Sequence, residues 1–197
     1  MAQSPLGLWY PQGVNASGQA LLNDPHPCGH IVYPYTDESH FTEAVSVFVS
    51  AGLRNGESAV LLIEHAHWKP IRHQLEQHGF DLETLESAGQ LARITAEDLA
   101  KSCVFDGIID EYEFKTKIGA MIQRAKSASY IGRVRVFGEL VNLLWMPNPK
   151  ATLRLEQLWN DIIKAHSVPL LCAYALGGSR PDVLDDALLA CHSAVAA

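Results

Sequence analysis

Three residues of this chain carry side chains that could act as an acid, a base or a nucleophile. Glu139, His30 and Cys172 lie at or within segments rich in β-branched and aromatic residues. A carboxyl, an imidazole and a thiol are groups that enzymes use in acid–base and nucleophilic catalysis. However, the chain has no Gly-x-Ser-x-Gly segment, and Cys172 lies in an apolar run where a cysteine is usually a small core residue. We expect no catalysis, with an enzyme using these three groups as the alternative.

Histidine and cysteine spacing also suggests metal chemistry. Cys28-Gly-His30 and His65-Ala-His67 have the i, i+2 spacing that points two ligands to one side of a strand, and His26 lies close to the first pair. Neither pair has an established zinc spacing. We therefore expect no metal and no cofactor, and metal binding by these pairs is the alternative.

The elements that position these groups are clearest in the first third of the chain. His30–Tyr35 is rich in β-branched and aromatic residues, which is typical of a strand. Apolar residues then recur at helical spacing over residues 38–54, and Asn55-Gly56 ends that helix. Ser58–Ile63 is apolar enough to be a strand buried on both faces. This strand–helix–strand unit predicts a parallel sheet.

The same alternation continues to the end of the chain. Further strands are expected over residues 90–95, 133–140 and 169–176, and helices over residues 66–78, 80–88, 110–127, 149–165 and 181–192. Residues 96–107 are expected to be a surface connection with one short helical turn. Residues 1–27, rich in Pro, Gly, Asn and Ser, are expected to be an extended or disordered arm, or to pack on the domain through Leu8, Trp9 and Tyr10. The pattern predicts one domain over residues 28–197, a three-layer α/β/α sandwich around a mainly parallel sheet.

The loop after the first strand is where a ligand site is expected, because open parallel sheets bind ligands at the carboxyl ends of their strands. Its residues are Thr36, Asp37, Glu38, Ser39 and His40. A phosphate-binding loop would carry glycines and a lysine here, whereas this loop has neither and has two carboxylates that repel phosphate. The loop argues against a nucleotide. Its simpler role is a helix N-terminus capped by Asp37 or Thr36, and contact with a polar ligand or a partner is the alternative.

Six side chains are the candidate ligand-binding residues: His30, Tyr35, Glu139, Trp145, Cys172 and Tyr174. If their strands are parallel neighbours, Tyr35, Glu139 and Tyr174 gather toward the carboxyl edge of the sheet. A buried Glu139 needs a hydroxyl, an imidazole or a polar ligand group beside it, because an unpaired buried carboxylate is costly. Trp145 would line an apolar pocket. A His–Glu or Tyr–Glu hydrogen bond that only ties strands together, and plain core packing of Trp145, are equal alternatives.

Charge and composition exclude several classes of protein. The net charge of −7 and the absence of basic clusters argue against direct nucleic-acid binding. No apolar run approaches the roughly 20 residues that cross a bilayer, and the first ten residues lack the features of a secretory signal. The four cysteines are far apart without a Cys-x-x-Cys pair, as expected of free thiols. We expect a cytoplasmic protein without membrane contact, with a homodimer as the base-rate assembly.

Two families resemble this chain. The segments AGLRNGESAVLLIE and HGFDLETLESAGQLARI are similar to parts of the RecA-like ATPases, especially their KaiC-type members. Gly138-Glu139 stands where those proteins carry a metal-binding aspartate, and the phosphate loop is missing. The resemblance therefore implies a RecA-like fold that has lost its nucleotide chemistry.

The closer resemblance is to the MEDS domain, the sensory domain of DcmR-type regulators. The matching segments are Gly29-His30-Ile31 with Tyr35, Gly56–Ile63, Ala88–Leu91, Phe137–Glu139 and Leu171–Tyr174, and they extend over about residues 28–192. The resemblance implies a non-catalytic module that senses a small organic, hydrocarbon-derived compound and signals through a histidine kinase or a transcription regulator. A scaffold protein or anti-regulator whose ligand cleft is filled by its own side chains is the alternative.

Overall fold

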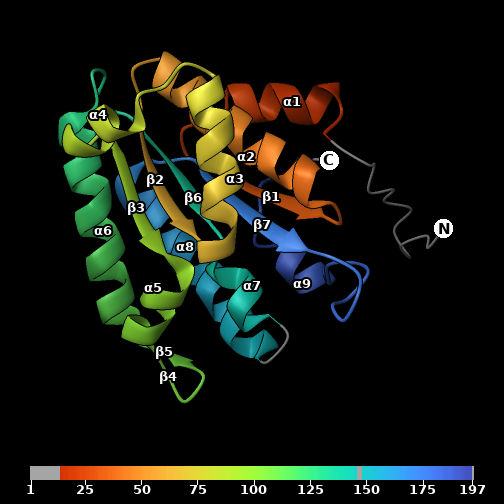
Figure 1. The fold of residues 1–197 in the computed structure, drawn as a ribbon. Helices are drawn as coiled ribbons and strands as arrows, with labels where there is room; N and C mark the ends of the chain where they lie inside the picture. Colours follow the sequence, from red (N-terminus) through yellow and green to blue (C-terminus); the bar gives the residue numbers. More distant parts are fainter. Residues whose placement is uncertain (1–13, 146–147, 197) are drawn as a thin grey trace.

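In the computed structural model, which describes residues 14–145 and 148–196, helices cover both faces of a six-stranded parallel sheet (Figure 1). The strands are β1 (His30–Tyr35), β2 (Ser58–Ile63), β3 (Leu91–Thr95), β6 (Val134–Gly138), β7 (Leu170–Ala175) and β8 (Ala194–Val195). They lie in the order β3-β2-β6-β7-β1-β8. The predicted α/β/α sandwich with a parallel sheet is confirmed.

The helices form two layers. One layer consists of α1 (Ala16–Asn23), α2 (Glu38–Arg54), α3 (His65–Gln77) and α4 (Leu82–Ser87), and the other of α5 (Ala96–Cys103), α6 (Glu111–Ala128), α7 (Leu140–Leu144), α8 (Pro149–His166) and α9 (Asp186–Leu189). A separate antiparallel hairpin, β4 (Val104–Phe105) and β5 (Ile108–Ile109), projects from one end of the molecule (Figure 1). Among the described residues, none of the helices combines the length and apolar character needed to cross a membrane.

The central strands are buried on both faces, and their side chains alternate between the two layers. Val32 and Cys172 pack in the core under α6 and α8, whereas Ile31 and Leu171 pack in the core under α2 and α3. The register pairs Val32 with Cys172 and Gly138 with Cys172, so β1, β7 and β6 are parallel neighbours as expected. This alternation decides which polar side chains can meet.

One buried ion pair anchors the first helix to the sheet. The Arg135 Nε on β6 lies 2.7 Å from Glu57 Oε2, and both side chains are almost fully buried. The same guanidinium donates to the carbonyls of Leu22 at 2.9 Å, Asn23 at 3.0 Å and Phe48 at 3.1 Å. A Cβ at Gly52 would lie 2.7 Å from Arg135 Cδ and Nε, so α2 needs a glycine there. Arg135 thus holds the end of α1 against α2.

This anchoring corrects the prediction for the N-terminal arm. Residues 16–23 form a helix rather than an extended segment, with Asn15 as its N-cap and Leu22 fully buried. The apolar residues Leu8, Trp9 and Tyr10 lie outside the described residues. The expected extended arm is therefore wrong over α1, which packs against the domain through Leu22.

Three other boundaries differ from the predictions. The segment 96–107 contains a full helix, α5, followed by a hairpin whose turn places Asp106 at φ 51° and Gly107 at φ 74°. The strand predicted over residues 133–140 ends at Gly138, and α7 begins at Leu140. The helix predicted over residues 181–192 is limited to α9, and the short strand β8 follows it.

The anchoring pair predicts a large loss of stability when Arg135 is replaced. Arg135→Met leaves the Glu57 carboxylate buried without its partner and frees three carbonyls, so we expect a loss of about 3–5 kcal/mol in the free energy of unfolding. Urea denaturation measures it. The matched control is Arg154→Met, which breaks the half-exposed pair with Glu111 and should cost less than about 1 kcal/mol. Equal losses in the two variants would contradict the anchoring role.

Candidate functional site

Acidic residues and a histidine gather at the carboxyl edge of the sheet. Glu64 directly follows β2, Glu139 directly follows β6, and these two strands are parallel neighbours. His67 lies in the first turn of α3, and Glu38 begins α2. We call Glu38, Glu64, His67 and Glu139 the edge cluster.

His67 bridges a buried and an exposed carboxylate in the edge cluster. Its Nδ1 lies 2.5 Å from Oε1 of the fully buried Glu139, and its Nε2 lies 3.2 Å from Oε2 of the exposed Glu38. The other Glu139 oxygen accepts the backbone N–H of Glu64 at 2.9 Å. Burial lowers the pKa of His67, but the hydrogen bond and charge of Glu139 and the charge of Glu38 outweigh it, so the pKa is raised. A protonated imidazole can satisfy both carboxylates.

Glu64 carries a carboxylate oxygen that the rest of the edge cluster does not satisfy. Its Oε1 is buried and has no hydrogen-bond partner among the described residues. Burial, followed by the charge of Glu139, raises the pKa of the Glu64 carboxyl. A group with a hydrogen-bond donor would satisfy this oxygen.

Aromatic rings form the apolar side of the edge cluster. The Phe41 ring lies 4.8 Å from the His67 ring and 4.5 Å from the Tyr35 ring, centroid to centroid. Burial and the nearby Glu139 raise the pKa of Tyr35. The Tyr35 hydroxyl is 3.5 Å from Asn142 Nδ2, and Asn142 Oδ1 accepts the N–H of Ala175 at 3.1 Å. The edge cluster therefore places three acids and a histidine beside an apolar wall.

The loop Thr36–His40 caps α2, which confirms the simpler of its two predicted roles. Asp37 is the N-cap, and its Oδ1 accepts the backbone N–H groups of Ser39 at 2.8 Å and His40 at 3.1 Å. The Ser39 hydroxyl also donates to this oxygen, and this hydrogen bond, followed by the two backbone ones, lowers the pKa of Asp37. Only Glu38 of this loop enters the edge cluster.

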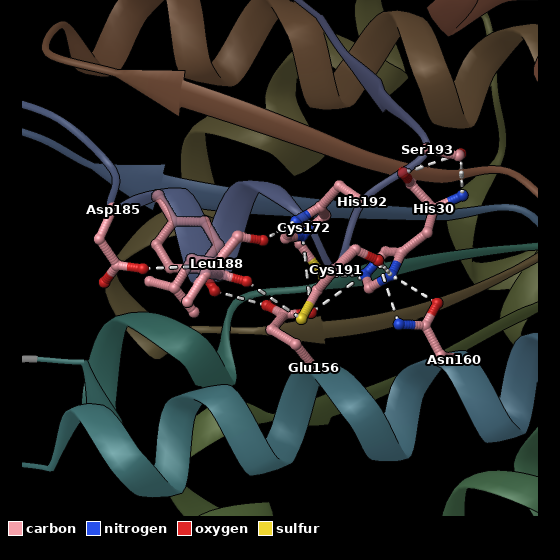
Figure 2. Close-up of polar contacts among 11 residues, drawn as sticks. His30, Glu156, Asn160, Cys172, Asp185, Leu188, Cys191, His192 and Ser193 are labelled. Atoms are coloured by element: carbon pink, nitrogen blue, oxygen red, sulfur yellow. Dashed lines mark hydrogen bonds and ion pairs between the residues drawn. The ribbon is translucent and has the colours of Figure 1, made fainter. Parts of the chain in front are cut away.

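A second group of polar side chains lies in the opposite core layer. His30 comes from β1, Glu156 from α8, Cys172 from β7 and His192 from the segment between α9 and β8 (Figure 2). We call these four residues the buried cluster, because no side chain among them is more than 2% exposed. Their metal-ligating atoms all lie within 4.8 Å of one another.

Glu156 is the centre of the buried cluster. Its Oε1 accepts the Tyr174 hydroxyl at 2.5 Å, and its Oε2 lies 3.0 Å from His30 Nε2 and 3.5 Å from His192 Nε2. The Cys172 Sγ is 3.5 Å from His30 Nε2 and 3.8 Å from Glu156 Oε2. Burial and Glu156 raise the pKa of Cys172 well above its usual range, whereas burial lowers the pKa of His192 to about 4. The thiol and the His192 ring are thus neutral near pH 7.

The structure divides the six predicted ligand residues between the two clusters. Tyr35 and Glu139 both lie at the carboxyl edge, where Phe41 and His67 lie between them. Tyr174 does not join them, because strand alternation turns it toward α8, where its hydroxyl bonds to Glu156. His30 and Cys172 belong to the buried cluster, and Tyr174 borders it through this hydrogen bond to Glu156. Trp145 is buried, with its ring 5.1 Å from the Tyr174 ring.

Four members of these clusters were not among the predicted site residues: Glu64, His67, Glu156 and His192. The sequence does contain a signal for Glu156, because an acidic residue within the apolar stripe of α8, one turn before Trp159, indicates a buried carboxylate. Glu64 also left one, since it directly follows a strand that is buried on both faces. His192 had none, because it comes from a loop that the sequence assigned to a helix.

The family model described as the methanogen/methylotroph DcmR sensory domain (MEDS) matches residues 29–193. No curated protein matches. A similar solved structure is a KaiC-like protein from the hyperthermophilic archaeon Pyrococcus horikoshii OT3, with a TM-score of 0.59 and 14% identity over 85% of this chain and 69% of that chain. The latter likeness shows the fold alone and agrees with the RecA-like prediction.

The raised pKa of His67 predicts a pH-dependent contribution to stability. A group whose pKa is higher in the folded state stabilises the fold fully below its unfolded pKa, about 6.5 for histidine, and loses that effect as pH rises through the folded pKa. We expect His67→Gln to lose on the order of 1 kcal/mol at pH 5.5, and less above pH 8. Urea denaturation across this range measures the difference. His73→Gln, which changes an exposed histidine of the same helix, should show no such trend.

Proposed function

Because the chain belongs to the MEDS family of sensory domains, we propose that it is a non-catalytic signalling module that binds a small organic ligand at the edge cluster. The buried Glu64 Oε1, which lacks a partner among the described residues, carries this proposal. It lies at the carboxyl edge of a parallel sheet, where such folds bind ligands. A ligand group that donates a hydrogen bond would complete the cluster.

The chemistry of the edge cluster suggests the class of ligand. Two carboxylates, Glu64 and Glu139, favour a hydroxyl or an ammonium group over an anion. The buried rings of Phe41 and Tyr35 give these acids apolar surroundings. A short-chain alcohol or amine, that is, a simple hydrocarbon derivative, has both features. His67, mostly buried between Glu38 and Glu139, would respond to the added charge or hydrogen bond.

The same region disfavours a nucleotide. A phosphate at this edge would need the free N–H groups of the α2 N-terminus, but Asp37 already accepts those of Ser39 and His40. The carboxylates of Asp37 and Glu38 would also repel it. These contacts support sensing without ATP hydrolysis.

The signal would reach a histidine kinase or a transcription regulator through a protein contact. The hairpin of β4 and β5 supports this step, because its Phe105 and Ile108 side chains are 57% and 72% exposed. Large exposed apolar side chains that lie together often mark protein-binding surfaces. Homodimer formation through the same hairpin is the other use of this surface.

The hairpin also supports a second candidate function, a scaffold protein or anti-regulator that binds a partner without any ligand. In that case Phe105 and Ile108 remain essential for partner binding, while the edge cluster is dispensable. The two functions therefore differ in which substitutions affect them.

Ligand binding can be tested with a panel of short-chain alcohols and amines, with ATP and magnesium included. We expect a member of the panel to bind in calorimetry, and Glu64→Gln to weaken its binding roughly 10-fold or more, because a charged hydrogen-bond acceptor is lost. Glu83→Gln, which removes an exposed acid from α4, should leave the affinity unchanged.

Two results would count against the sensory proposal. Tight ATP binding with hydrolysis would contradict the absence of catalysis. A panel in which nothing binds, together with partner binding that depends on Phe105 and Ile108 alone, would favour the scaffold function.

A further inference from the structure

The buried cluster has an unusual arrangement of protons on its two histidines. His30 Nδ1 faces two acceptors, Asn160 Oδ1 at 3.2 Å and the Cys191 carbonyl at 3.1 Å. The Asn160 amide is oriented by its own Nδ2, which donates to the same carbonyl at 3.1 Å. Nδ1 of His30 must therefore carry a proton and donate it. In a neutral ring, Nε2 then presents a lone pair.

The position of the proton on the His192 ring follows from its acceptor in the same way. Its Nδ1 lies 2.8 Å from the Leu188 carbonyl, which can only accept. Its Nε2 is buried, has no hydrogen-bond partner among the described residues, and points to Glu156 Oε2 at 3.5 Å. Both imidazoles thus direct their Nε2 atoms toward the same carboxylate (Figure 2).

The centre of the cluster therefore has more acceptors than donors. Two Nε2 lone pairs and one carboxylate oxygen converge there, and the thiol of Cys172 can supply a single weak donor. A proton between His30 and Glu156 would satisfy that pair but would leave His192 Nε2 without a partner. A cation that accepts all of these lone pairs satisfies every group at once.

The spacing of these atoms fits such a cation. Four of the six separations among the ligand atoms run from 3.0 to 3.8 Å, and all six lie within 4.8 Å. Bonds of about 2.0–2.3 Å to a tetrahedral ion place its ligands roughly 3.3–3.7 Å apart. The ligands come from β1, β7, α8 and the segment after α9, so an ion bound by them would join these four parts of the fold.

We propose that His30 Nε2, Glu156 Oε2, Cys172 Sγ and His192 Nε2 bind one divalent transition-metal ion of the zinc class. Two imidazoles, a thiolate and a carboxylate suit zinc, whereas calcium and magnesium take oxygen ligands. Binding displaces the thiol proton to solvent, so the thiolate becomes the fourth ligand. With four protein ligands and no open position, the site is structural rather than catalytic.

Neighbouring groups already hold the ligands in place for this ion. The Cys191 and Leu188 carbonyls fix the two imidazoles, and the Tyr174 hydroxyl bonds to the second oxygen of Glu156. Such outer contacts set the tautomer of a metal-binding histidine and orient a metal-binding carboxylate. The ion would join the segment that follows α9 to β1, β7 and α8. This role is separate from ligand binding at the edge cluster.

Metal analysis of the full chain tests the site. We expect the purified protein, after incubation with Zn²⁺ and gel filtration, to retain one ion per chain. Replacement by Co²⁺ should give a thiolate-to-cobalt charge-transfer band in the near ultraviolet. Competition with a chromophoric chelator then gives the affinity.

Substitutions assign the ligands. His192→Ala should weaken Zn²⁺ binding by roughly 100-fold or more. Cys172→Ser should weaken binding and remove the charge-transfer band. The matched control is Cys103→Ser, which changes another buried thiol outside the cluster and should keep both the affinity and the band.

The proposal is overturned if the wild-type chain retains no stoichiometric Zn²⁺, or if the Co²⁺ form lacks the thiolate band. It is also overturned if His192→Ala and Cys172→Ser bind Zn²⁺ as tightly as Cys103→Ser does. Should either variant fail to fold, the cobalt spectrum of the wild-type chain still decides the question, because Glu64, His67 and Glu139, the other group of possible metal ligands among the described residues, include no thiol. None of these results depends on ligand binding at the edge cluster, so the two proposals can fail separately.

Discussion

The cost of burying a carboxylate without partners governs the polar interior of this protein. Glu57, Glu139 and Glu156 are each no more than 2% exposed, and each is surrounded by groups that satisfy its charge. Glu57 has the Arg135 guanidinium, and Glu139 has His67 and a backbone N–H. Glu156 has the Tyr174 hydroxyl and, in the proposal above, a metal ion that it shares with His30. Each set of partners brings together elements that are far apart in sequence. The glutamates therefore join α1 to the sheet, α3 to the carboxyl edge, and the C-terminal segment to α8.

Strand alternation then determines which cluster a residue can enter. The sequence predicted the five long strands and the parallel sheet, because their apolar runs and the helical repeats between them are local patterns. It also predicted that Glu139 and Tyr35 lie toward the carboxyl edge of the sheet. It placed Tyr174 with them because all three lie toward the ends of strands, but Tyr35 and Tyr174 face opposite layers. The register that decides this, Pro34 beside Tyr174, is a long-range property.

The remaining differences between the predicted and the observed elements have local and non-local causes. The hairpin carried a local signal, since Asp106-Gly107 between apolar residues favours a two-residue turn with positive φ. Helix α1 and strand β8 carried little signal of their own. The former is held by the Arg135 guanidinium, and the latter by the N–H of Ala196 on the carbonyl of Val32 and the N–H of Ser193 on that of His30. Tertiary contacts, rather than local propensity, define both.

The two-residue strand β8 has a consequence for aggregation. It is the outermost strand on its side of the sheet and covers β1, whose six residues are all buried. Without β8, the backbone N–H and C=O groups along that apolar strand would be open to another chain, which is how edge strands template intermolecular pairing. A strand of two residues is itself too short to act as such a template. Strand β8 therefore protects this edge of the sheet, and its detachment would expose β1 to pairing with a second copy of the chain.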